Sequence, residues 1–420
     1  MTDSVSGRDR TEVDALIVGG GPAGLAAAVQ LRRSGASVIV LERDGEAGGV
    51  ARHSNHLGYG VRDLHRLLNG PAYAKAWTER AVHAGADLRV RTTATGWVAA
   101  DEGHALTVTS PAGVEEIRAR TILLATGCRE RPRSARLVPG SRPAGILTTG
   151  SLQQLVHLHG ARAVRRAVVV GAEHVSYSAV MTIAHAGGRT VAMLTHAPSS
   201  ATFPAVDRAA RVHYRFPLRT MTTLTEIHGQ QRVEGVTIRD VRTGTNERLA
   251  CDAVVFTGDW VPDHELARGG ALPLSLGFGA PDVDAFGRTA RPGIFAAGNL
   301  LHGACTADMC AHEGRRAAGA MAAHLDDNPW PEAPIVLVAD DPVAWVSPGR
   351  LSLASQDLDG VRLVAAVRAA ANGALVLRQG TNEVRVTRRR TWVPGRLAYV
   401  AGRYLRSLDP MSGPLHLAID

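Results

Sequence analysis

The chain has 420 residues, a formal net charge of +8, 45% hydrophobic residues and 20% charged residues. This length is enough for about three domains, and this composition is typical of globular proteins. Arginine supplies nearly all of the positive charge, since Lys75 is the only lysine. The arginines are spread along the chain rather than clustered, so we do not expect a nucleic-acid-binding surface.

Membrane insertion, secretion and a disulfide framework are not expected either. No apolar run approaches the length of a membrane span, and the polar residues 1–10 lack the apolar core of a signal peptide. Four cysteines in a chain of this length fit a reducing compartment. We therefore expect a cytoplasmic protein.

Residues 13–49 contain the most informative motif. A short apolar run predicts a buried strand, a GxGxxG turn and an alanine-rich helix follow, and a second apolar run ends in an acid. In such a turn the first glycine allows the tight bend, the second lets a pyrophosphate approach the backbone, and the third lets helix and strand pack closely. Glu42 lies 18 residues past Gly24, close to the spacing of an acid that binds ribose hydroxyls. The predicted dinucleotide-binding residues are Gly19, Gly21, Pro22, Ala23, Gly24, Glu42, Arg43 and Gly49.

Two further segments follow the same plan: a buried strand with a glycine turn at 121–127 (TILLATG), and a strand and turn near residue 170. Together with the first motif, they resemble the flavoproteins built from two dinucleotide-binding domains, the glutathione-reductase-like class. The resemblance implies FAD as cofactor. In the disulfide reductases of the class a redox cysteine pair follows the first motif, and the two places fall here on Ala51 and His56, which excludes that chemistry at this position. His53 and His56 are then candidate catalytic residues, or else ordinary polar groups of a loop.

The segment after Gly127 resembles a narrower group, the flavoprotein subunits of opine and amino-acid oxidising enzymes and of cyanide synthase. That group carries an Arg-Glu-Arg-Pro run after the glycine turn, and the alternative interpretation of the run is a domain hinge held by charge pairs. A later stretch around Trp260 also matches, and Trp260 either approaches the flavin or merely packs. The matching positions are Arg129, Glu130, Arg131, Pro132, Gly150 and Gln154.

A second strand, turn and helix begin at Ala167 and imply a second dinucleotide-type domain inserted in the first. Gly171 is kept, but Glu173 and Ser176 stand at the second and third glycine places. A carboxylate against a pyrophosphate in a poorly hydrated site costs on the order of several kcal/mol. The second strand ends in His196, which could meet a 2′-phosphate, and not in an acid. NAD(P)H binding is therefore doubtful, and a domain kept for its shape is favoured.

Residues 287–320 resemble the C-terminal FAD motif of the same class, a short strand, a turn, and a helix whose N-terminus points at the flavin. Asn299 stands where an aspartate is usual, and its amide can still hydrogen-bond a ribityl hydroxyl. The dipole of a helix from about Ala307 would stabilise negative charge on reduced flavin. From these later segments the predicted cofactor-binding residues are Thr126, Gly127, Gly298, Asn299, Thr306 and Ala307.

Cys305 and Cys310 have the spacing used by one class of flavin-linked disulfides, but at a different place in the chain. If both were helical they would point about 140° apart, which is too divergent for a disulfide. A bridge becomes possible if Cys305 precedes the helix. We expect instead two small thiols packed near the cofactor.

The sequence predicts an α/β fold with two Rossmann-like dinucleotide-binding domains, the second inserted in the first, and a C-terminal all-β domain. We predict an FAD-binding domain over 1–148 and 272–330 and a degenerate NAD(P)-binding-like domain over 149–271. After a proline-rich linker, strands of period two suggest a β-sandwich over 333–420. This tail has no cysteines, so the iron-sulfur segment of some opine-oxidase-type subunits is not expected.

The function that the resemblance implies is oxidation of an amine, amino acid or imino acid by hydride transfer to flavin. One alternative is an NAD(P)H-dependent flavin reductase, and another is a flavin-binding subunit of a hetero-complex with little activity alone. The expected partners are a small-molecule substrate and either an electron acceptor or a partner subunit. No metal site is predicted.

Overall fold

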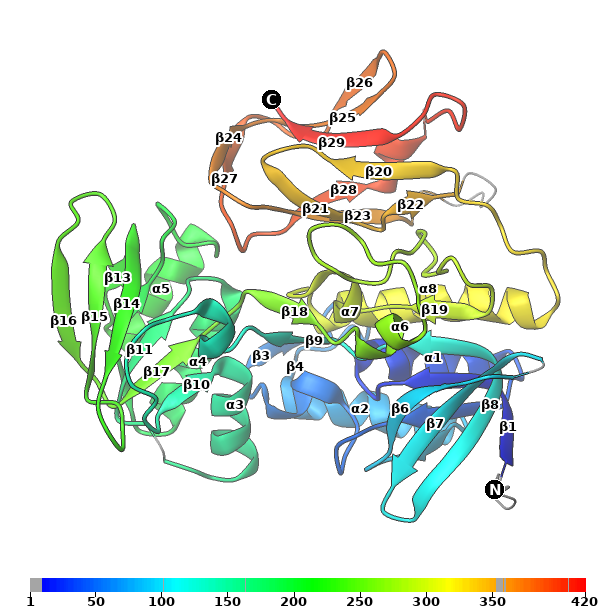
Figure 1. Ribbon diagram of the computed structural model, residues 1–420, viewed down its shortest axis with the longest axis horizontal. Coiled ribbons are helices and arrows are strands. Elements are labelled where there is room, and N and C mark those ends of the chain that lie inside the picture. Colours follow the sequence, from blue (N-terminus) through cyan, green and yellow to red (C-terminus); the bar gives the residue numbers. More distant parts are fainter. Residues whose placement is uncertain (1–9, 101, 163, 353–357, 359, 407) are drawn as a thin grey trace, which may run out of the picture.

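The computed structural model describes residues 10–100, 102–162, 164–352, 358, 360–406 and 408–420. Its strands gather in three regions, with the N-terminal sheet at the lower right, the middle sheet at the left and the C-terminal strands above (Figure 1). No helix in the described part of the chain is both long enough and apolar enough to cross a membrane.

The first sheet is mostly parallel and carries the first glycine motif. Its order is β5 (Asp87–Arg89), β2 (Val38–Leu41), β1 (Arg10–Val18), β8 (Gly113–Leu124), β7 (His104–Ser110) and β6 (Thr93–Val98). The end of β8 also pairs in parallel with β19 (Ile294–Ala296), so the chain returns to this sheet after the middle region. Buried aliphatic side chains from β1, β2 and β8 make both faces of the sheet apolar, which suits a parallel sheet covered on each side.

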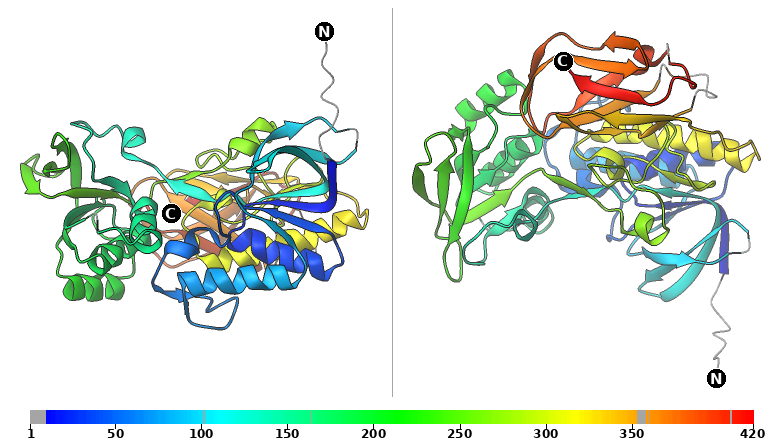
Figure 2. Two further views of the ribbon diagram at one scale, coloured as in Figure 1. Left: turned by 90° about the horizontal axis from the view of Figure 1, so that it is seen from below. Right: turned by 45° about the horizontal axis from the view of Figure 1, so that its top comes forward.

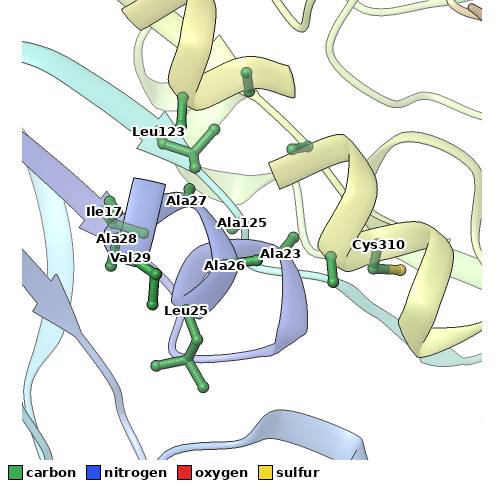
Figure 3. Packing of buried hydrophobic residues seen from close by; sticks show 14 of the residues in the cluster. Ile17, Ala23, Leu25, Ala26, Ala27, Ala28, Val29, Leu123, Ala125 and Cys310 are labelled. Atoms are coloured by element: carbon green, nitrogen blue, oxygen red, sulfur yellow. The ribbon is translucent and has the colours of Figure 1, made fainter. Parts of the chain in front are cut away.

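Helices α1 (Pro22–Arg33) and α8 (Ala307–Leu325) pack against each other through small side chains. A Cβ added to Gly314 of α8 would lie only 2.0 Å from the carbonyl oxygen of Ala23. Figure 3 shows Ala23 and Ala26 of α1 beside the helix that carries Cys310. A Cβ added to Gly298, just past β19, would also lie 2.9 Å from the Cβ of Ala23. The N-terminal turn of α1 and the loop before α8 therefore meet at one edge of the sheet.

The middle region contains a second parallel sheet and an antiparallel one. The parallel sheet has the order β10 (Ile146–Thr148), β17 (Ala253–Phe256), β11 (Arg166–Val170), β12 (Arg189–Leu194) and β13 (Leu218–Arg219). Helix α4 (His174–His185) connects β11 to β12, as the strand, turn and helix pattern predicts. β10 already belongs to this sheet, although it ends at the predicted domain boundary. The antiparallel sheet consists of β14 (Thr222–His228), β15 (Gly235–Asp240) and β16 (Asn246–Ala250).

The remaining elements before the C-terminal region lie between these strands or between the regions. They are η1 (Gly49–His53), β3 (Leu57–Tyr59), β4 (Leu68–Asn69), α2 (Gly70–His83), β9 (Cys128–Glu130), η2 (Arg133–Arg136), α3 (Thr149–Gln153), the π-helical η3 (Gln154–Leu158), α5 (Pro204–Tyr214), β18 (Trp260–Pro262), α6 (Glu265–Gly269) and α7 (Asn299–His302). The crossings between the first two regions are held together by the pairing of β9 with β18.

The C-terminal region is rich in strands, as predicted, and its sheets share one apolar core. One sheet has the order β22 (Arg350–Leu351), β20 (Ile335–Ala339), β29 (Leu415–Ile419), β25 (Leu375–Gln379) and β26 (Asn382–Arg385). The others are β21 (Val343–Ser347), β23 (Arg362–Val367) and β28 (Ala398–Ala401), and the pair β24 (Ala371–Gly373) and β27 (Arg390–Trp392), with the short helix η4 (Gly402–Leu405) after β28. The right view of Figure 2 shows these strands over α8 and beside the middle region. The predicted fold class is confirmed, and the division into domains stays a prediction.

Candidate flavin site

The glycine turn between β1 and α1 has an open centre between packed neighbours. Gly19 has φ +114°, and a Cβ there would lie 2.3 Å from the carbonyl oxygen of Ala125. A Cβ on Gly24 would lie 2.0 Å from the carbonyl oxygen of Gly19. By contrast, a Cβ on Gly21, the residue that caps α1, would meet nothing within 4 Å. The first and third glycines are thus required by packing, and the second faces open space at a helix N-terminus, where phosphate binds well.

Glu42 follows β2 and lies beside this turn. Its side chain is buried, its Oε2 accepts a hydrogen bond from the Gly20 N–H at 3.1 Å, and its Oε1 accepts one from the Asp44 N–H at 2.9 Å. Burial raises the pKa of the Glu42 carboxyl above its usual value. Each oxygen keeps a further lone pair, so the carboxyl can accept ribose hydroxyls while the backbone holds it in place. Arg43 is largely exposed and forms a 3.8 Å ion pair with Asp263.

Two more predicted segments border the open centre of the turn. A Cβ on Gly49, at the start of η1, would lie 3.1 Å from the Cα of Gly21. Gly127 follows β8, and a Cβ there would meet nothing within 4 Å. The neighbouring Thr126 hydroxyl donates to the carbonyl oxygen of Asp263 at 2.7 Å. Gly21 and Gly127 are therefore the two predicted glycines that face space rather than protein, as a cradle for a bound cofactor requires.

The C-terminal motif uses Asn299 differently from our expectation. The Nδ2 of Asn299 donates to the carbonyl oxygen of Cys305 at 3.3 Å, and the Cys305 N–H donates to its Oδ1 at 3.0 Å. The amide therefore closes the loop before α8, and one N–H and one oxygen lone pair are left for a ribityl hydroxyl. Thr306 is the N-cap of α8 but its side chain makes no capping bond, so the N–H groups around Ala307 are left to a ligand or solvent.

Two acids behind this motif were not predicted. The carboxyl of Asp308 accepts hydrogen bonds from the Gly60 and Arg62 N–H groups, both at 2.9 Å, and so ties the segment after η1 to α8. Glu313 accepts from the Gly298 N–H at 3.1 Å and lies 2.8 Å from the Nε2 of the buried His302. Asp308 is an acid in the first turn of a helix, which is a general signal, but its partners Gly60 and Arg62 lie far from it in sequence.

The buried His302 is also next to Cys305. Burial by itself lowers the pKa of His302, but Cys305 and Glu313 together raise it well above 6.5. Cys305 and Cys310 are both free thiols, exposed by only 7% and 5%. Cys305 precedes α8 whereas Cys310 lies within it, and both are buried, while their packing beside the cofactor stays a prediction.

The two predicted catalytic histidines lie in different environments. The His53 side chain at the end of η1 is buried, and its Nδ1 has no hydrogen-bond partner among the described residues. Burial, and then the charge of Arg52, lower the pKa of His53 to about 4. The ring of His56 instead bonds within its own loop, to the Ser54 hydroxyl at 3.1 Å and to the Leu57 carbonyl oxygen at 2.9 Å. Of the two rings, only that of His53 has a nitrogen without a hydrogen-bond partner among the described residues, whereas both nitrogens of His56 are bonded.

Trp260, the third predicted catalytic residue, lies on β18 opposite Glu130 of β9. A Cβ on Gly303 would come within 2.7 Å of the Cβ of Trp260, so this residue packs on the loop before α8. Trp260 therefore lies against the segment that runs from Asn299 to Cys305. A direct contact with flavin stays a prediction.

The Arg-Glu-Arg-Pro run holds the crossing between the first two sheets. Arg129 pairs with Asp263 and bonds Glu265 at 2.8 Å. The carboxyl of Glu130 accepts from the Gly150 N–H at 2.8 Å, at the start of α3. Arg136, just beyond the run, donates to the carbonyl oxygens of residues 257 and 258 at 2.9 and 2.8 Å. Arg129 is held by charge pairs, and Glu130 and Arg136 are held by backbone groups, so the run fixes the crossing, while its role as a hinge stays a prediction.

The second glycine turn, between β11 and α4, is filled by the protein itself. A Cβ on Gly171 would lie 2.0 Å from the Thr257 Oγ1 and 2.6 Å from the Glu173 Oε2. The Glu173 carboxyl accepts from the Ser176 hydroxyl at 2.9 Å and the Thr257 hydroxyl at 3.2 Å, and it caps α4. Burial raises the pKa of this carboxyl. The residues at this turn do not fit a pyrophosphate, because a carboxylate occupies its place.

Known proteins resemble the chain at the level of family and fold. A family model described as pyridine nucleotide-disulphide oxidoreductase matches residues 13–321. An opine oxidase subunit from Agrobacterium tumefaciens (strain Ach5) is 28% identical over 351 residues, which cover 74% of this chain and 66% of that protein. The alpha subunit of sarcosine oxidase from Corynebacterium sp. (strain P-1) is 27% identical over 260 residues, or 59% of this chain and 26% of that protein. This chain therefore spans about a quarter of the sarcosine oxidase protein.

Solved structures show the same fold at low identity. Thioredoxin reductase from T. acidophilum has a TM-score of 0.63 at 21% identity, over 74% of this chain and 98% of that one. L-proline dehydrogenase from P. horikoshii has a TM-score of 0.56 at 18% identity, over 76% of this chain and 57% of that one. The family match covers most of the chain, and a Cβ on Gly21 or on Gly127 would meet nothing within 4 Å, so neither residue blocks the approach of a dinucleotide. The chain therefore belongs to the pyridine nucleotide-disulphide oxidoreductase family and is an FAD-dependent oxidoreductase.

Proposed function

We propose that this FAD-dependent oxidoreductase removes a hydride from the carbon next to nitrogen in an amine, amino acid or imino acid. The observation that carries the proposal is the uncharged, buried His53, which follows the flavin cradle in a segment where Ala51 and His56 replace a redox cysteine pair. The likeness to subunits of opine and sarcosine oxidases gives independent support.

The chemistry needs an uncharged substrate nitrogen. As the hydride leaves, the nitrogen lone pair forms the new C=N bond, and an ammonium has no such lone pair. Bound FAD supplies the two-electron acceptor. With its pKa lowered to about 4, His53 is uncharged at neutral pH, so it does not repel a cationic substrate. Its Nδ1 is buried and has no partner among the described residues, and it would hydrogen-bond the neutral amine once substrate binding uncovers it. The residues that would hold the cofactor are Gly21, Glu42, Gly127 and the first turn of α8.

Anaerobic mixing tests the proposal. The FAD-loaded protein is mixed with secondary amino acids, primary amino acids and primary amines, and with NADH and NADPH, while the flavin absorbance is recorded. We expect bleaching by a nitrogen compound and none by the nicotinamides. Bleaching by NADH or NADPH within milliseconds to seconds, with no amine active, would instead establish the flavin reductase alternative.

His53→Gln tests the residue and His56→Gln is its matched control. Loss of one hydrogen bond to the substrate should slow flavin reduction about tenfold, which corresponds to about 1.4 kcal/mol. The His56 variant should stay within about twofold, because that ring bonds only its own loop. Equal effects in both variants would contradict the role of His53.

A second candidate function is that of a flavin-binding subunit in a hetero-complex. Residues 50–67, in η1 and the segment after it, expose large apolar side chains: Val50 by 60%, Leu57 by 66%, Val61 by 50% and Leu67 by 64%. An apolar surface of this kind favours contact with another protein. Bleaching by neither amines nor nicotinamides in the isolated chain would favour this candidate over direct oxidation.

We further propose that the chain divides into an FAD-binding domain over 1–148 and 272–330, a degenerate nucleotide-binding-like domain over 149–271, and a C-terminal β-sandwich over 333–420. The return of the chain to the first sheet at β19 supports the split. The pairing of β10 with β17 suggests moving the first boundary to just before Ile146. Limited proteolysis tests the division, with cleavage expected in the linker between α8 and β20.

A further inference from the structure

The filled turn after β11 is covered by a second segment from far along the chain. Gly395, between β27 and β28, has φ +82° and lies directly against the acid at this turn. A Cβ on Gly395 would come within 2.5 Å of the Cγ of Glu173. Only glycine fits so close an approach at this backbone conformation. The C-terminal region therefore contacts the place where a second dinucleotide would sit.

Arg396 fixes this contact. Its Nε donates to the carbonyl oxygen of Ala201 at 2.8 Å, and its Nη2 donates to those of Ser200 at 3.2 Å and Thr202 at 2.8 Å. The Ala201 N–H in turn donates to the carbonyl oxygen of Ala172 at 3.0 Å, inside the glycine turn. The segment 200–202 follows β12, at the carboxyl edge of the sheet where nucleotides bind in such folds. One guanidinium thus joins the C-terminal region to the loop after β12, and that loop is in turn bonded to the glycine turn.

We propose that the second dinucleotide site is sealed by the chain itself, and that NADH and NADPH are not reductants of this flavoprotein. We call Glu173, Gly395 and Arg396 together the seal. The inference goes beyond amine oxidation and does not depend on it. A nicotinamide dinucleotide would have to displace a carboxylate that is hydrogen-bonded to Ser176 and Thr257, and also the loop that covers it.

The covering part of the seal comes from outside the range that the family model matches. The family model matches residues 13–321, so Gly395 and Arg396 lie outside it. The covering loop therefore comes from a region that the family model does not include. The first turn, within the same chain, has no such cover, since a Cβ on Gly21 would meet nothing within 4 Å.

Nucleotide binding to the FAD-loaded full chain tests the seal. Isothermal titration with NADH and with NADPH is done on wild type, Glu173→Gly, Arg396→Ala and the double variant. We expect a wild-type dissociation constant weaker than about 1 mM, and binding at least tenfold tighter in the double variant than in wild type. Each single variant should gain less, because the other half of the seal remains.

Arg378→Ala is the matched control, since its guanidinium pairs with Glu383 and Asp420 within the C-terminal sheet. It should bind nucleotides no better than wild type. Hydrogen exchange gives a second readout, in which Arg396→Ala speeds amide exchange in 199–202 and leaves the turn after β1 unchanged. Micromolar binding of either nucleotide by wild type would overturn the proposal. So would a double variant that retains FAD, exchanges faster at 199–202 and still gains no binding.

If the double variant does not fold, wild type alone still decides the matter. At about 0.1 mM of either nucleotide (about a tenth of the 1 mM threshold), amide exchange in 171–176 should be unchanged. Clear protection of that segment would contradict the seal.

Discussion

The turn after β1 and the turn after β11 share one backbone plan and differ in the space around it. At the first turn, Gly21 faces open space at the N-terminus of α1, and the nearby Glu42 is held to one side by the Gly20 N–H. At the second, Glu173 occupies the corresponding position and is hydrogen-bonded in place. The comparison indicates that such a turn leaves room for a dinucleotide only where the second position lacks a side chain, and that the strand, turn and helix can form with a side chain at that position.

The largest expected effect is at the open position of the first turn. Gly21→Val should abolish FAD retention, because a β-branched side chain would occupy the place of the pyrophosphate. Gly96→Val is the control. A Cβ at Gly96 would also meet nothing within 4 Å, but this residue lies on strand β6 and not in the glycine turn. The FAD-to-protein ratio after gel filtration gives the result. A Gly21→Val protein with a full complement of FAD would remove the basis of the comparison.

A smaller loss is expected when the acid beside the first turn is changed. Glu42→Gln keeps the shape of the side chain and removes its charge. A charge-assisted hydrogen bond contributes about 1.5–3 kcal/mol, so we expect FAD affinity to fall by about 10- to 100-fold. Titration of the apoprotein with FAD, followed by flavin fluorescence, measures this. Unchanged affinity would mean that Glu42 serves only to hold the Gly20 turn.

The acid at the second turn should affect stability and not FAD. Burial raises the pKa of Glu173 in the folded state, so this group contributes stability that is present below its unfolded pKa and is lost as the pH rises through the folded value. Glu173→Gln removes the titration. Relative to wild type, its melting temperature should therefore be higher by about a few degrees at pH 8, and this advantage should shrink towards pH 4.

FAD content should stay unchanged in Glu173→Gln. A larger advantage at pH 4 than at pH 8 would contradict the sign of this effect. Thermal melts followed by circular dichroism at both pH values make the comparison, and Glu383→Gln on the exposed strand β26 serves as the control.

The sequence predicted those parts of the two sites that depend on neighbouring residues. The spacing of Gly19, Gly21 and Gly24 could be interpreted from the motif alone, because each glycine place in it has its own steric requirement. The same holds for Glu173, which stands at one of these places. The cover by Arg396 was not predictable, since its partners are backbone carbonyl oxygens almost two hundred positions earlier in the chain. A carbonyl oxygen has no residue signature, so sequence gives no sign of such a contact.

The same limit applies around the flavin cradle. Asn299 was assigned to a ribityl hydroxyl, whereas its amide bonds the backbone of Cys305 on both sides. The carboxyl of Asp308 accepts hydrogen bonds from two N–H groups of the segment after η1, 248 and 246 positions earlier in the chain. In both cases the residue type was suited to hydrogen bonding, and only the folded chain determined the partner.

The smallest expected effect concerns the thiols behind the first site. If the first site differs from the second only by its open glycine turn, Cys305 and Cys310 are packing residues. Replacing both by serine should then keep substrate-driven flavin reduction within about tenfold, a barrier change near 1.4 kcal/mol. Both side chains are buried and unpaired, and burial raises the pKa of Cys310 well above 9, so that thiol is protonated at neutral pH and a weak nucleophile. Cys251→Ser, a buried thiol in the middle region, controls for the general cost of a buried hydroxyl. The decisive measurement combines stopped-flow flavin reduction with a thiol titration of wild type before and after dithiothreitol. A far larger loss of rate with FAD still bound, together with two additional thiols on reduction, would make the pair a redox centre and would show that the first site depends on more than its glycine turn.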